Sequence, residues 1–247
     1  MTIADWLGLL LPLLFACVLL WKRHKRQQSL AQAFGTTFDR QVPLEVTVGI
    51  AIGGIVMLGV FTVEWTLGAV QFTGSNGMTE LWWRWLLLLV VAALFEELLA
   101  RSFLLGGLLS LLGKAKWTAV VISALYFGIA HITNPNATIV SAGGNALGGV
   151  MYAVAFLGSG RIWMACGLHF AWNFFQGMVF GFPVSGITTP SILHQTAVGP
   201  EWATGGAYGP EAGLVGMLSR LVVIVLVFGW LKRRQPEKSW GKLLRFE

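Results

Sequence analysis

The chain has 247 residues, of which 55% are hydrophobic and 11% are charged, whereas about a quarter of the residues of a soluble domain are charged. This composition excludes an ordinary soluble protein. The net charge of +6 does not indicate nucleic-acid binding, because the Lys and Arg residues gather at the ends of apolar runs, where they set membrane topology. We therefore expect one integral-membrane domain over residues 1–247, with no nucleic-acid partner.

Seven apolar runs predict an all-α, polytopic transmembrane helical bundle, since each span needs about 20 apolar residues. In chain order, these runs cover about residues 3–21, 44–70, 82–112, 117–132, 137–157, 162–180 and 214–231. An eighth span follows if part of segment 181–213 inserts into the bilayer, or if the second run is broken at Gly53–Gly54.

All of the basic clusters fall on one side of the bilayer in the seven-span arrangement. They are residues 22–26, Lys114 with Lys116, the turn 158–161 that ends in Arg161, and residues 232–234. Because Lys and Arg mark the cytoplasmic side, we expect a multi-pass protein of the cell membrane, with its N-terminus outside and its C-terminus in the cytoplasm. Segment 71–80 is then an external loop, and segment 181–213 is expected to lie on or dip into the outer surface.

Three charges interrupt the third run, in the heptapeptide Phe-Glu-Glu-Leu-Leu-Ala-Arg at residues 95–101. A charged side chain at bilayer depth costs roughly 2.5–3.5 kcal/mol, so these three need partners or a hydrated cavity. Glu97 and Arg101 are four residues apart and can pair on one helix face. Glu96 points about 100° away from that face, so it is left as an unpaired carboxylate.

Other polar groups inside apolar runs can pair with these charged side chains. The candidates that we recognise are His131, Asn145, His169, Asn173 and Glu64. Of these, His169 and Asn173 share one helix face, as do Phe127 and His131, because each pair is four residues apart. We expect these faces to bury against the third run and enclose one polar pocket, although His131 lies near the outer end of its span and His169 only about 12 Å from the inner turn.

Such a pocket has the groups that a hydrolase needs. A buried carboxylate can act as a general base towards water, and histidine and asparagine side chains can stabilise the oxyanion that develops on a peptide carbonyl. The sequence contains neither a Gly-x-Ser-x-Gly nucleophile motif nor a His-Glu-x-x-His zinc motif.

The charged heptapeptide and the two histidine motifs together resemble the CPBP family, also called the Abi or CAAX-protease family, of intramembrane endopeptidases. The motifs that carry this resemblance, in order on three hydrophobic helices, are Glu96-Glu97-x-x-x-Arg101, Phe127-x-x-x-His131 and His169-x-x-x-Asn173. The resemblance covers roughly residues 82–180, which we expect to form the catalytic core.

The resemblance implies a role for each motif residue. Glu96 is expected to activate the attacking water with help from His131, while His169 and Asn173 hold the oxyanion. The residues expected to support the site are Glu97, Arg101 and Phe127. This glutamate mechanism needs no metal and no other cofactor; a zinc site made by Glu96, His131 and His169, with water as the fourth ligand, is the alternative.

The expected function is hydrolysis of a peptide bond near the C-terminus or membrane anchor of a protein substrate, as in CAAX processing or in the processing of C-terminal sorting signals. The expected partners are the lipid bilayer and a protein or peptide with a hydrophobic or lipidated C-terminal segment. The alternative is a non-catalytic immunity or scaffold protein that binds a partner through the same pocket. A transporter would show inverted internal repeats, and the sequence shows none that we recognise.

Overall fold

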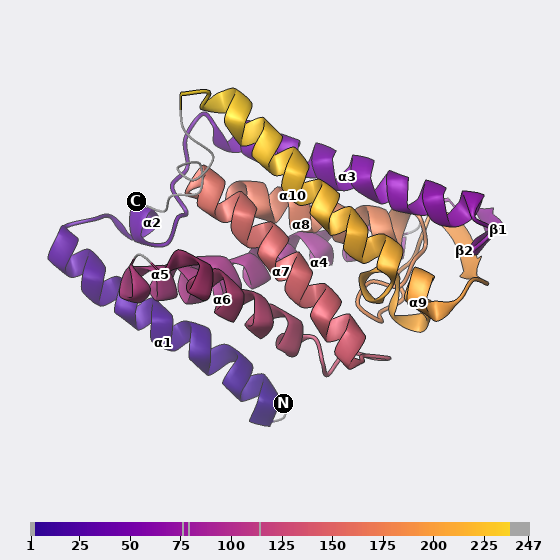
Figure 1. Ribbon diagram of the computed structural model, residues 1–247, viewed down its shortest axis with the longest axis horizontal. Coiled ribbons are helices and arrows are strands. Elements are labelled where there is room, and N and C mark those ends of the chain that lie inside the picture. Colours follow the sequence, from indigo (N-terminus) through magenta and orange to yellow (C-terminus); the bar gives the residue numbers. More distant parts are fainter. Residues whose placement is uncertain (1–2, 76, 79, 114, 238–247) are drawn as a thin grey trace.

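The computed structural model is a helical bundle with a small sheet at one end (Figure 1). It describes residues 3–75, 77–78, 80–113 and 115–237, without the side chains of residues 3–8 and 26. Lys114, one of the basic residues used for topology above, lies outside the described residues. The α-helices are α1 Ile3–Arg26, α2 Leu30–Ala33, α3 Val42–Thr66, α4 Glu80–Glu97, α5 Gly106–Leu112, α6 Lys116–Ala130, α7 Ile139–Ser159, α8 Trp163–Asn173, α9 Glu201–Thr204 and α10 Leu214–Arg234.

Short helical segments of other types complete these elements. The π-helices are η1 Leu98–Leu105 and η2 Phe174–Val179, and the 3₁₀-helices are η3 Gly206–Tyr208 and η4 Pro210–Ala212. Because α4, η1 and α5 follow one another without a break, they form one continuous helical rod. η2 extends α8 in the same way.

The prediction of a mostly helical protein is confirmed, and three described helices are long and apolar enough to cross a membrane. These are α3, α7 and α10, and α6 is a shorter apolar helix. The three long helices coincide with the second, fifth and seventh predicted spans to within a few residues at each end. Their apolar composition indicates a membrane protein.

The prediction of an external loop over residues 71–80 is wrong for its first half, which forms a strand. β1 Val70–Ser75 pairs antiparallel with β2 Leu193–Ala197, and the register shifts between Phe72 and Gly74. Backbone N–H and C=O groups need hydrogen-bond partners, and each strand supplies these partners to the other. The pairing also joins segment 181–213 to the segment that connects the second and third predicted spans.

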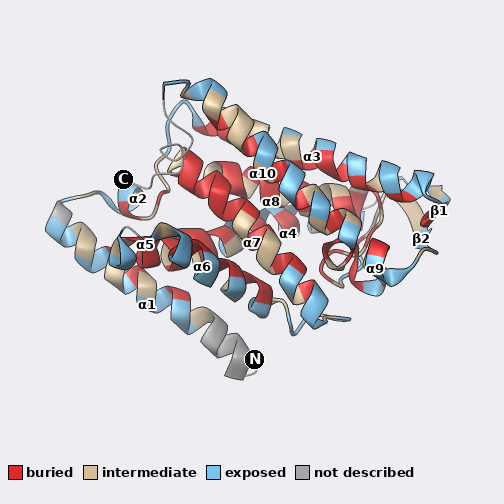
Figure 2. Cartoon of the chain, viewed as in Figure 1, coloured by how far each residue is buried: buried red, intermediate tan, exposed pale blue. Residues whose placement is uncertain are grey.

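The centre of the bundle is formed by α7 and α8, as the buried residues in Figure 2 show. In the most apolar 18-residue stretch of α7, 61% of the residues are buried, whereas the corresponding value for α10 is 28%. Glycines allow the central helices to come close to their neighbours: a Cβ on Gly167 would lie 2.5 Å from the Val46 carbonyl oxygen, and a Cβ on Gly49 would lie 2.5 Å from that of Met164. The backbones of α3 and α8 are therefore in direct contact.

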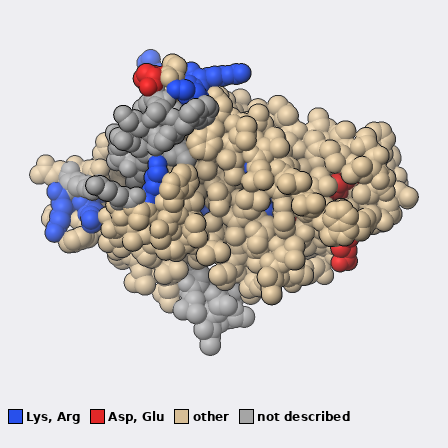
Figure 3. Space-filling model, viewed as in Figure 1, with Lys and Arg blue, Asp and Glu red and all other residues tan. Residues whose placement is uncertain are grey.

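Charged side chains lie mainly at the two ends of the bundle. Figure 3 shows the Lys and Arg residues at the end where α1 and α10 finish, with some Asp or Glu beside them, further Asp or Glu at the opposite end, and a broad, mostly uncharged face between the two ends. Large apolar side chains such as Leu125 of α6 and Val225 of α10 are exposed. A contiguous apolar exterior of this extent is typical of contact with lipid rather than with water.

At the basic end, Arg161 connects two other segments to the turn between α7 and α8. Its guanidinium lies 2.6 Å from the carboxylate of Asp39 and 2.5 Å from that of Glu45. The hydrogen bond from Arg161 holds the pKa of Asp39 below its ordinary value. The connection fixes the start of α3 against the start of α8, and it thereby helps to set the depth of α8 in the bundle.

Candidate active site

The charged heptapeptide lies where the third predicted span changes its helix type. Glu96 and Glu97 end α4, and the π-helix η1 begins at Leu98 and contains Arg101. Ser123 of α6 donates a hydrogen bond of 2.9 Å to the Ala100 carbonyl inside η1, which gives this segment a side-chain partner on a neighbouring helix. π-helical segments inside α-helices occur frequently at functional sites.

Glu97 and Arg101 form the ion pair that their spacing predicts. Arg101 Nε lies 2.9 Å from Glu97 Oε2, and both side chains have 0% exposure. A second contact, from an Arg101 terminal nitrogen to Glu97 Oε1, measures 3.2 Å. The guanidinium also lies over the rings of Phe127 and Tyr152, at 4.5 Å and 5.2 Å from their centroids. These aromatic faces stabilise the buried cation.

His169 of α8 is held in one orientation by Glu97 and by aromatic rings. Its Nδ1 lies 3.0 Å from Glu97 Oε1, and because a carboxylate accepts hydrogen bonds, Nδ1 carries the proton. Tyr152 stacks on the imidazole at 4.6 Å between centroids, and Phe127 meets it edge-on at 5.8 Å. The ring therefore turns its other nitrogen, Nε2, away from Glu97 and towards the neighbouring carboxylate.

His131 directly follows the last residue of α6, and its side chain points back along that helix. Its Nδ1 lies 2.7 Å from the Phe127 carbonyl oxygen, which can only accept, so here too Nδ1 carries the proton and Nε2 is left free. Side chains of a helix tilt towards its N-terminus, and this tilt brings the imidazole of His131 down to the depth of His169. The apparent mismatch in depth between the two histidines is thereby resolved.

Glu96 faces both of these imidazoles. Its Oε2 lies 3.6 Å from His131 Nε2 and 3.9 Å from His169 Nε2. Within the described part of the chain, Oε2 is buried without a hydrogen-bond partner, whereas the side chain as a whole is 34% exposed. A partly exposed carboxylate thus faces the Nε2 atoms of two histidines. A water molecule that donates one hydrogen bond to Glu96 and the other to His131 Nε2 would be polarised towards loss of a proton.

Asn173 lies one helical turn after His169 and ends α8, so the two residues share a helix face as predicted. The side chain is half-buried. Unlike the two histidines, it has no side-chain hydrogen bond or ion pair to the other motif residues in the described part of the chain. Its amide therefore has both its donors and its acceptor available.

A second buried polar network was missed by the sequence analysis, which overlooked Arg220. This residue lies in α10 and is 2% exposed. Its guanidinium donates a hydrogen bond to the Gly144 carbonyl and lies 3.8 Å from the Glu211 carboxylate. It also lies over the Trp172 ring, 5.0 Å from the ring centroid. The signal that could have found it is a lone charge in a long apolar run, which is the signal that identified Glu96. Asn145 accepts from Arg220 at 3.4 Å and donates to Tyr208 at 2.6 Å.

Tyr152 is the second residue that sequence reasoning missed. It lies on α7, is 3% exposed and contacts His169, Phe127 and Arg101 through its ring. A single aromatic residue in an apolar run carries no pattern that separates it from ordinary core packing. Only the fold shows that α7 brings it against the imidazole.

The residues of the alternative zinc site are near one another, but they are not placed as a set of metal ligands. Among the described residues, no group of three or more His, Cys, Asp or Glu side chains is arranged to hold a metal ion. The free Nε2 atoms of His131 and His169 are the kind of donor that zinc accepts. Their distances to Glu96 exceed 3.5 Å, so ligation would require the three side chains to close in.

Comparison with known proteins finds a family model that matches part of the chain. Residues 78–175, less than half of the chain, match the family model described as type II CAAX prenyl endopeptidase Rce1-like. No curated protein and no solved structure matches the chain significantly. The matched range contains all seven residues of the three motifs and leaves out α1, α3, segment 181–213 and α10. Residues 78–175 are therefore similar to the Rce1-like CAAX prenyl endopeptidases.

Proposed function

We propose that the protein is an intramembrane endopeptidase in which Glu96 activates the attacking water. The observation that carries this proposal is the position of Glu96, whose carboxylate is partly exposed and lies 3.6 Å and 3.9 Å from the free nitrogens of two anchored histidines. The two neighbouring carboxylates have different environments. Glu97 is fully buried and forms an ion pair with Arg101, whereas the Glu96 side chain is 34% exposed and has no Lys or Arg partner in the described part of the chain. This division leaves Glu96 as the group that can exchange a proton with water.

In the proposed reaction, Glu96 takes a proton from water while the water oxygen bonds to the substrate carbonyl carbon. The π electrons of that carbonyl move to its oxygen, which accepts hydrogen bonds from His169 Nε2–H and from the Asn173 amide. The C–N bond then breaks, and the leaving amine takes the proton from Glu96, which restores the carboxylate. His131 accepts a hydrogen bond from the attacking water and orients it.

The position of Glu97 supports this assignment. The proposed role of His169 requires a proton on each ring nitrogen, so that Nδ1–H donates to Glu97 while Nε2–H donates to the oxyanion. Glu97, Arg101 and Phe127 are accordingly proposed to orient His169 rather than to touch the substrate.

We further propose that the chain crosses the membrane seven times, with its N-terminus outside and its C-terminus in the cytoplasm. In support, seven helical rods run between the ends of the bundle, if the continuous stretches α4–η1–α5 and α8–η2 are each taken as one. The Lys and Arg residues gather at one of these ends (Figure 3), which the positive-inside rule identifies as cytoplasmic. The candidate active site would then lie within the bilayer.

The proposed substrate is a membrane-anchored protein with a lipidated C-terminus, by analogy with the family's CAAX prenyl endopeptidases. Cleavage would release the last three residues and leave the prenylated cysteine as the new C-terminus. The test is to incubate the purified protein, in liposomes, with a prenylated Cys-aliphatic-aliphatic-X peptide and to detect the released tripeptide by mass spectrometry. A protein that releases no tripeptide contradicts the proposed substrate class.

Prior treatment with a metal chelator is expected to leave the rate of cleavage unchanged, because the proposed base is a carboxylate and the site does not bring three ligands together. The measurement compares the rate before and after dialysis against chelator, with the metal content determined in parallel. Loss of activity together with one equivalent of bound zinc, and recovery on adding zinc back, would replace the glutamate mechanism by the zinc alternative.

A further inference from the structure

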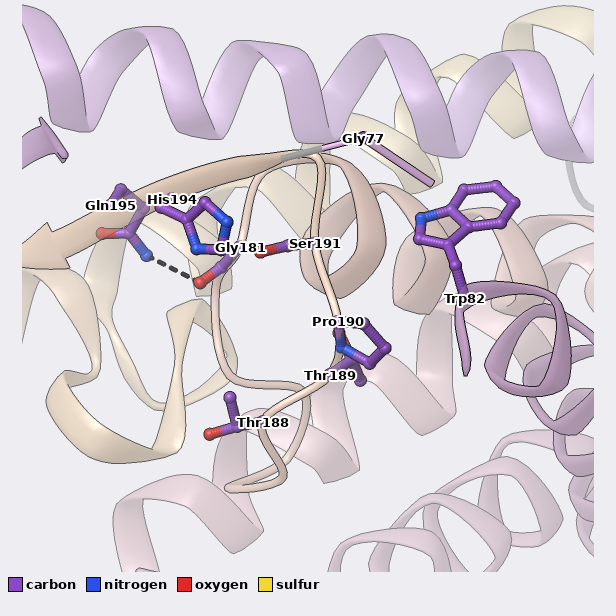
Figure 4. Close-up of a pocket in the computed structure, with 9 residues that line it drawn as sticks. All are labelled: Gly77, Trp82, Gly181, Thr188, Thr189, Pro190, Ser191, His194 and Gln195. Carbon is purple, nitrogen blue, oxygen red and sulfur yellow. Dashed lines mark hydrogen bonds between the residues drawn. The ribbon is translucent and has the colours of Figure 1, made fainter. Parts of the chain in front are cut away.

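The rod formed by α4, η1 and α5 is held at its start by the end of the bundle that carries the small sheet. There Trp82 packs edge-on against Phe174 of η2, with 5.8 Å between the ring centroids, and lines a small pocket opposite the loop over residues 181–195 (Figure 4). These contacts lie fourteen residues before Glu96, or about 21 Å along the helix. None of them involves α6, so the position of Glu96 relative to His131 depends on contacts further along the rod.

One face of α6 carries three residues that contact the charged heptapeptide. They are spaced four residues apart and so share that face, and they are Ser123, Phe127 and His131. The first donates a hydrogen bond of 2.9 Å to the Ala100 carbonyl. The ring centroid of the second lies 4.5 Å from the Arg101 guanidinium, and Nε2 of the third lies 3.6 Å from Glu96 Oε2. The face therefore meets the backbone, the cation and one carboxylate of the heptapeptide.

The contact between Glu96 and His131 does not fix its own length. At 3.6 Å it is longer than a direct hydrogen bond of about 2.7–3.2 Å, and the proposed reaction uses the gap for the attacking water. Because His131 Nδ1 is bonded to the Phe127 carbonyl of its own helix, the imidazole moves together with α6. The width of the gap therefore depends on how α6 is placed against the rod.

Ser123 provides a directional link between α6 and the rod. Its side chain is 0% exposed, so bulk water does not compete for the hydroxyl. Ala100 lies within η1, and its carbonyl oxygen has two lone pairs, so it can accept from a neighbouring helix as well as from its own. The next residue of α6 packs closely on α7, since a Cβ on Gly149 would lie 2.8 Å from Ala124 Cα. α6 is thus held between α7 and η1.

We propose that Ser123 is a positioning residue of the active site, whose hydrogen bond to Ala100 sets the place of α6 against the rod and thereby keeps His131 at the distance from Glu96 that one water molecule needs. This inference rests on the proposed peptidase function. A hydrogen bond weakens steeply when it lengthens or when its angle falls below about 120°, so it resists both sliding and rotation of the helix. Ser123 itself is buried and touches neither the water nor the substrate.

The test measures steady-state cleavage of a prenylated peptide by the Ser123→Ala variant in liposomes. Its kcat is expected to fall by about 10- to 100-fold, because small misplacements of catalytic groups have effects of this size. KM is expected to change by less than about twofold, since Ser123 makes no contact with the substrate. Ser123→Cys, which keeps nearly the same size but is a weaker donor, is expected to give an intermediate kcat.

Ser102→Ala is the matched control. Ser102 lies on η1, is 1% exposed, and donates to the Phe34 carbonyl of the segment that follows α2. This variant loses the same kind of buried hydrogen bond without altering the contact with α6. It is expected to unfold at a temperature similar to that of Ser123→Ala and to keep the kcat of the unmodified protein. An equal loss of kcat in both variants would reveal a general structural effect and overturn the inference.

The action through His131 is tested by combining Ser123→Ala with His131→Gln. When the imidazole to be positioned is already absent, Ser123→Ala is expected to lower kcat by less than about twofold further, because the two changes affect one interaction. If the two losses of kcat multiply instead, Ser123 does not act through His131 and the inference fails.

A measurement of helix placement separates this inference from the proposed function. Spin labels at Val91 of α4 and Leu125 of α6, both exposed, report the distance between the two helices once the two native cysteines are replaced by alanine. Ser123→Ala is expected to shift or broaden this distance distribution, and Ser102→Ala to leave it unchanged. If the distances respond in this way but the unmodified protein cleaves no prenylated peptide, the proposed function fails and Ser123 still positions α6. If the protein cleaves and neither kcat nor the distances respond to Ser123→Ala, only the positioning role fails.

Discussion

Replacing Glu96 by glutamine is expected to lower kcat for a prenylated peptide by about 10²- to 10⁴-fold, because the amide keeps the shape of the side chain and removes the general base. KM is expected to change little, since Glu96 acts on the water rather than on the substrate's lipid or chain. The measurement is steady-state cleavage by the purified variant in liposomes, with its thermal unfolding recorded to show that it folds.

Glu80→Gln is the matched control for this experiment. Glu80 lies on the same helix, is 82% exposed and pairs with Arg84 at 2.5 Å, so the same chemical change removes a surface carboxylate only. Its kcat is expected to equal that of the unmodified protein. A Glu96→Gln variant that cleaves as fast as the Glu80→Gln variant rules out Glu96 as the base.

The second large effect is expected on stability, from Arg101→Met. This change leaves the fully buried Glu97 carboxylate without its cation, and breaking a buried ion pair from one side costs about 3–5 kcal/mol. The loss also releases the contacts of the guanidinium with Phe127 and Tyr152. The thermal unfolding temperature in detergent is expected to fall steeply, and His169 is expected to lose its orientation with it.

Arg84→Met offers a close comparison, because Arg84 and Glu80 form the same i, i+4 pair on the surface of the same helix. With side chains 73% and 82% exposed, that pair is expected to contribute about 0–1 kcal/mol. The double variant Glu97→Gln with Arg101→Met removes both charges and is expected to be more stable than Arg101→Met alone. An Arg101→Met protein that unfolds at the same temperature as Arg84→Met would show that the buried pair is not structural.

Much of the fold follows from the sequence because the bilayer imposes a simple pattern. Long apolar runs predict helices, and the run at 44–70 indeed forms α3, the run at 137–157 forms α7 and the run at 214–231 forms α10. The ion pair between Glu97 and Arg101 could be predicted from their spacing alone, because contacts within one helix depend only on sequence separation.

The remaining features depend on contacts between distant segments, which no local pattern encodes. The strand over residues 70–75 forms only because residues 193–197 lie beside it. The depth of His131 depends on a side chain that turns back along α6, and the orientation of His169 depends on Tyr152 of another helix. Arg220 is a different case, since the lone charge was visible and was overlooked.

The central claim, hydrolysis by water that Glu96 activates, is tested most directly by a single turnover in H₂¹⁸O. The experiment uses the protein in molar excess over a prenylated peptide and analyses both the product and the protein by mass spectrometry. We predict that the new carboxylate of the prenylated cysteine contains ¹⁸O and that Glu96 contains none. An unlabelled product, or ¹⁸O in the side chain of Glu96, would show that the carboxylate attacks the substrate itself and would contradict the account.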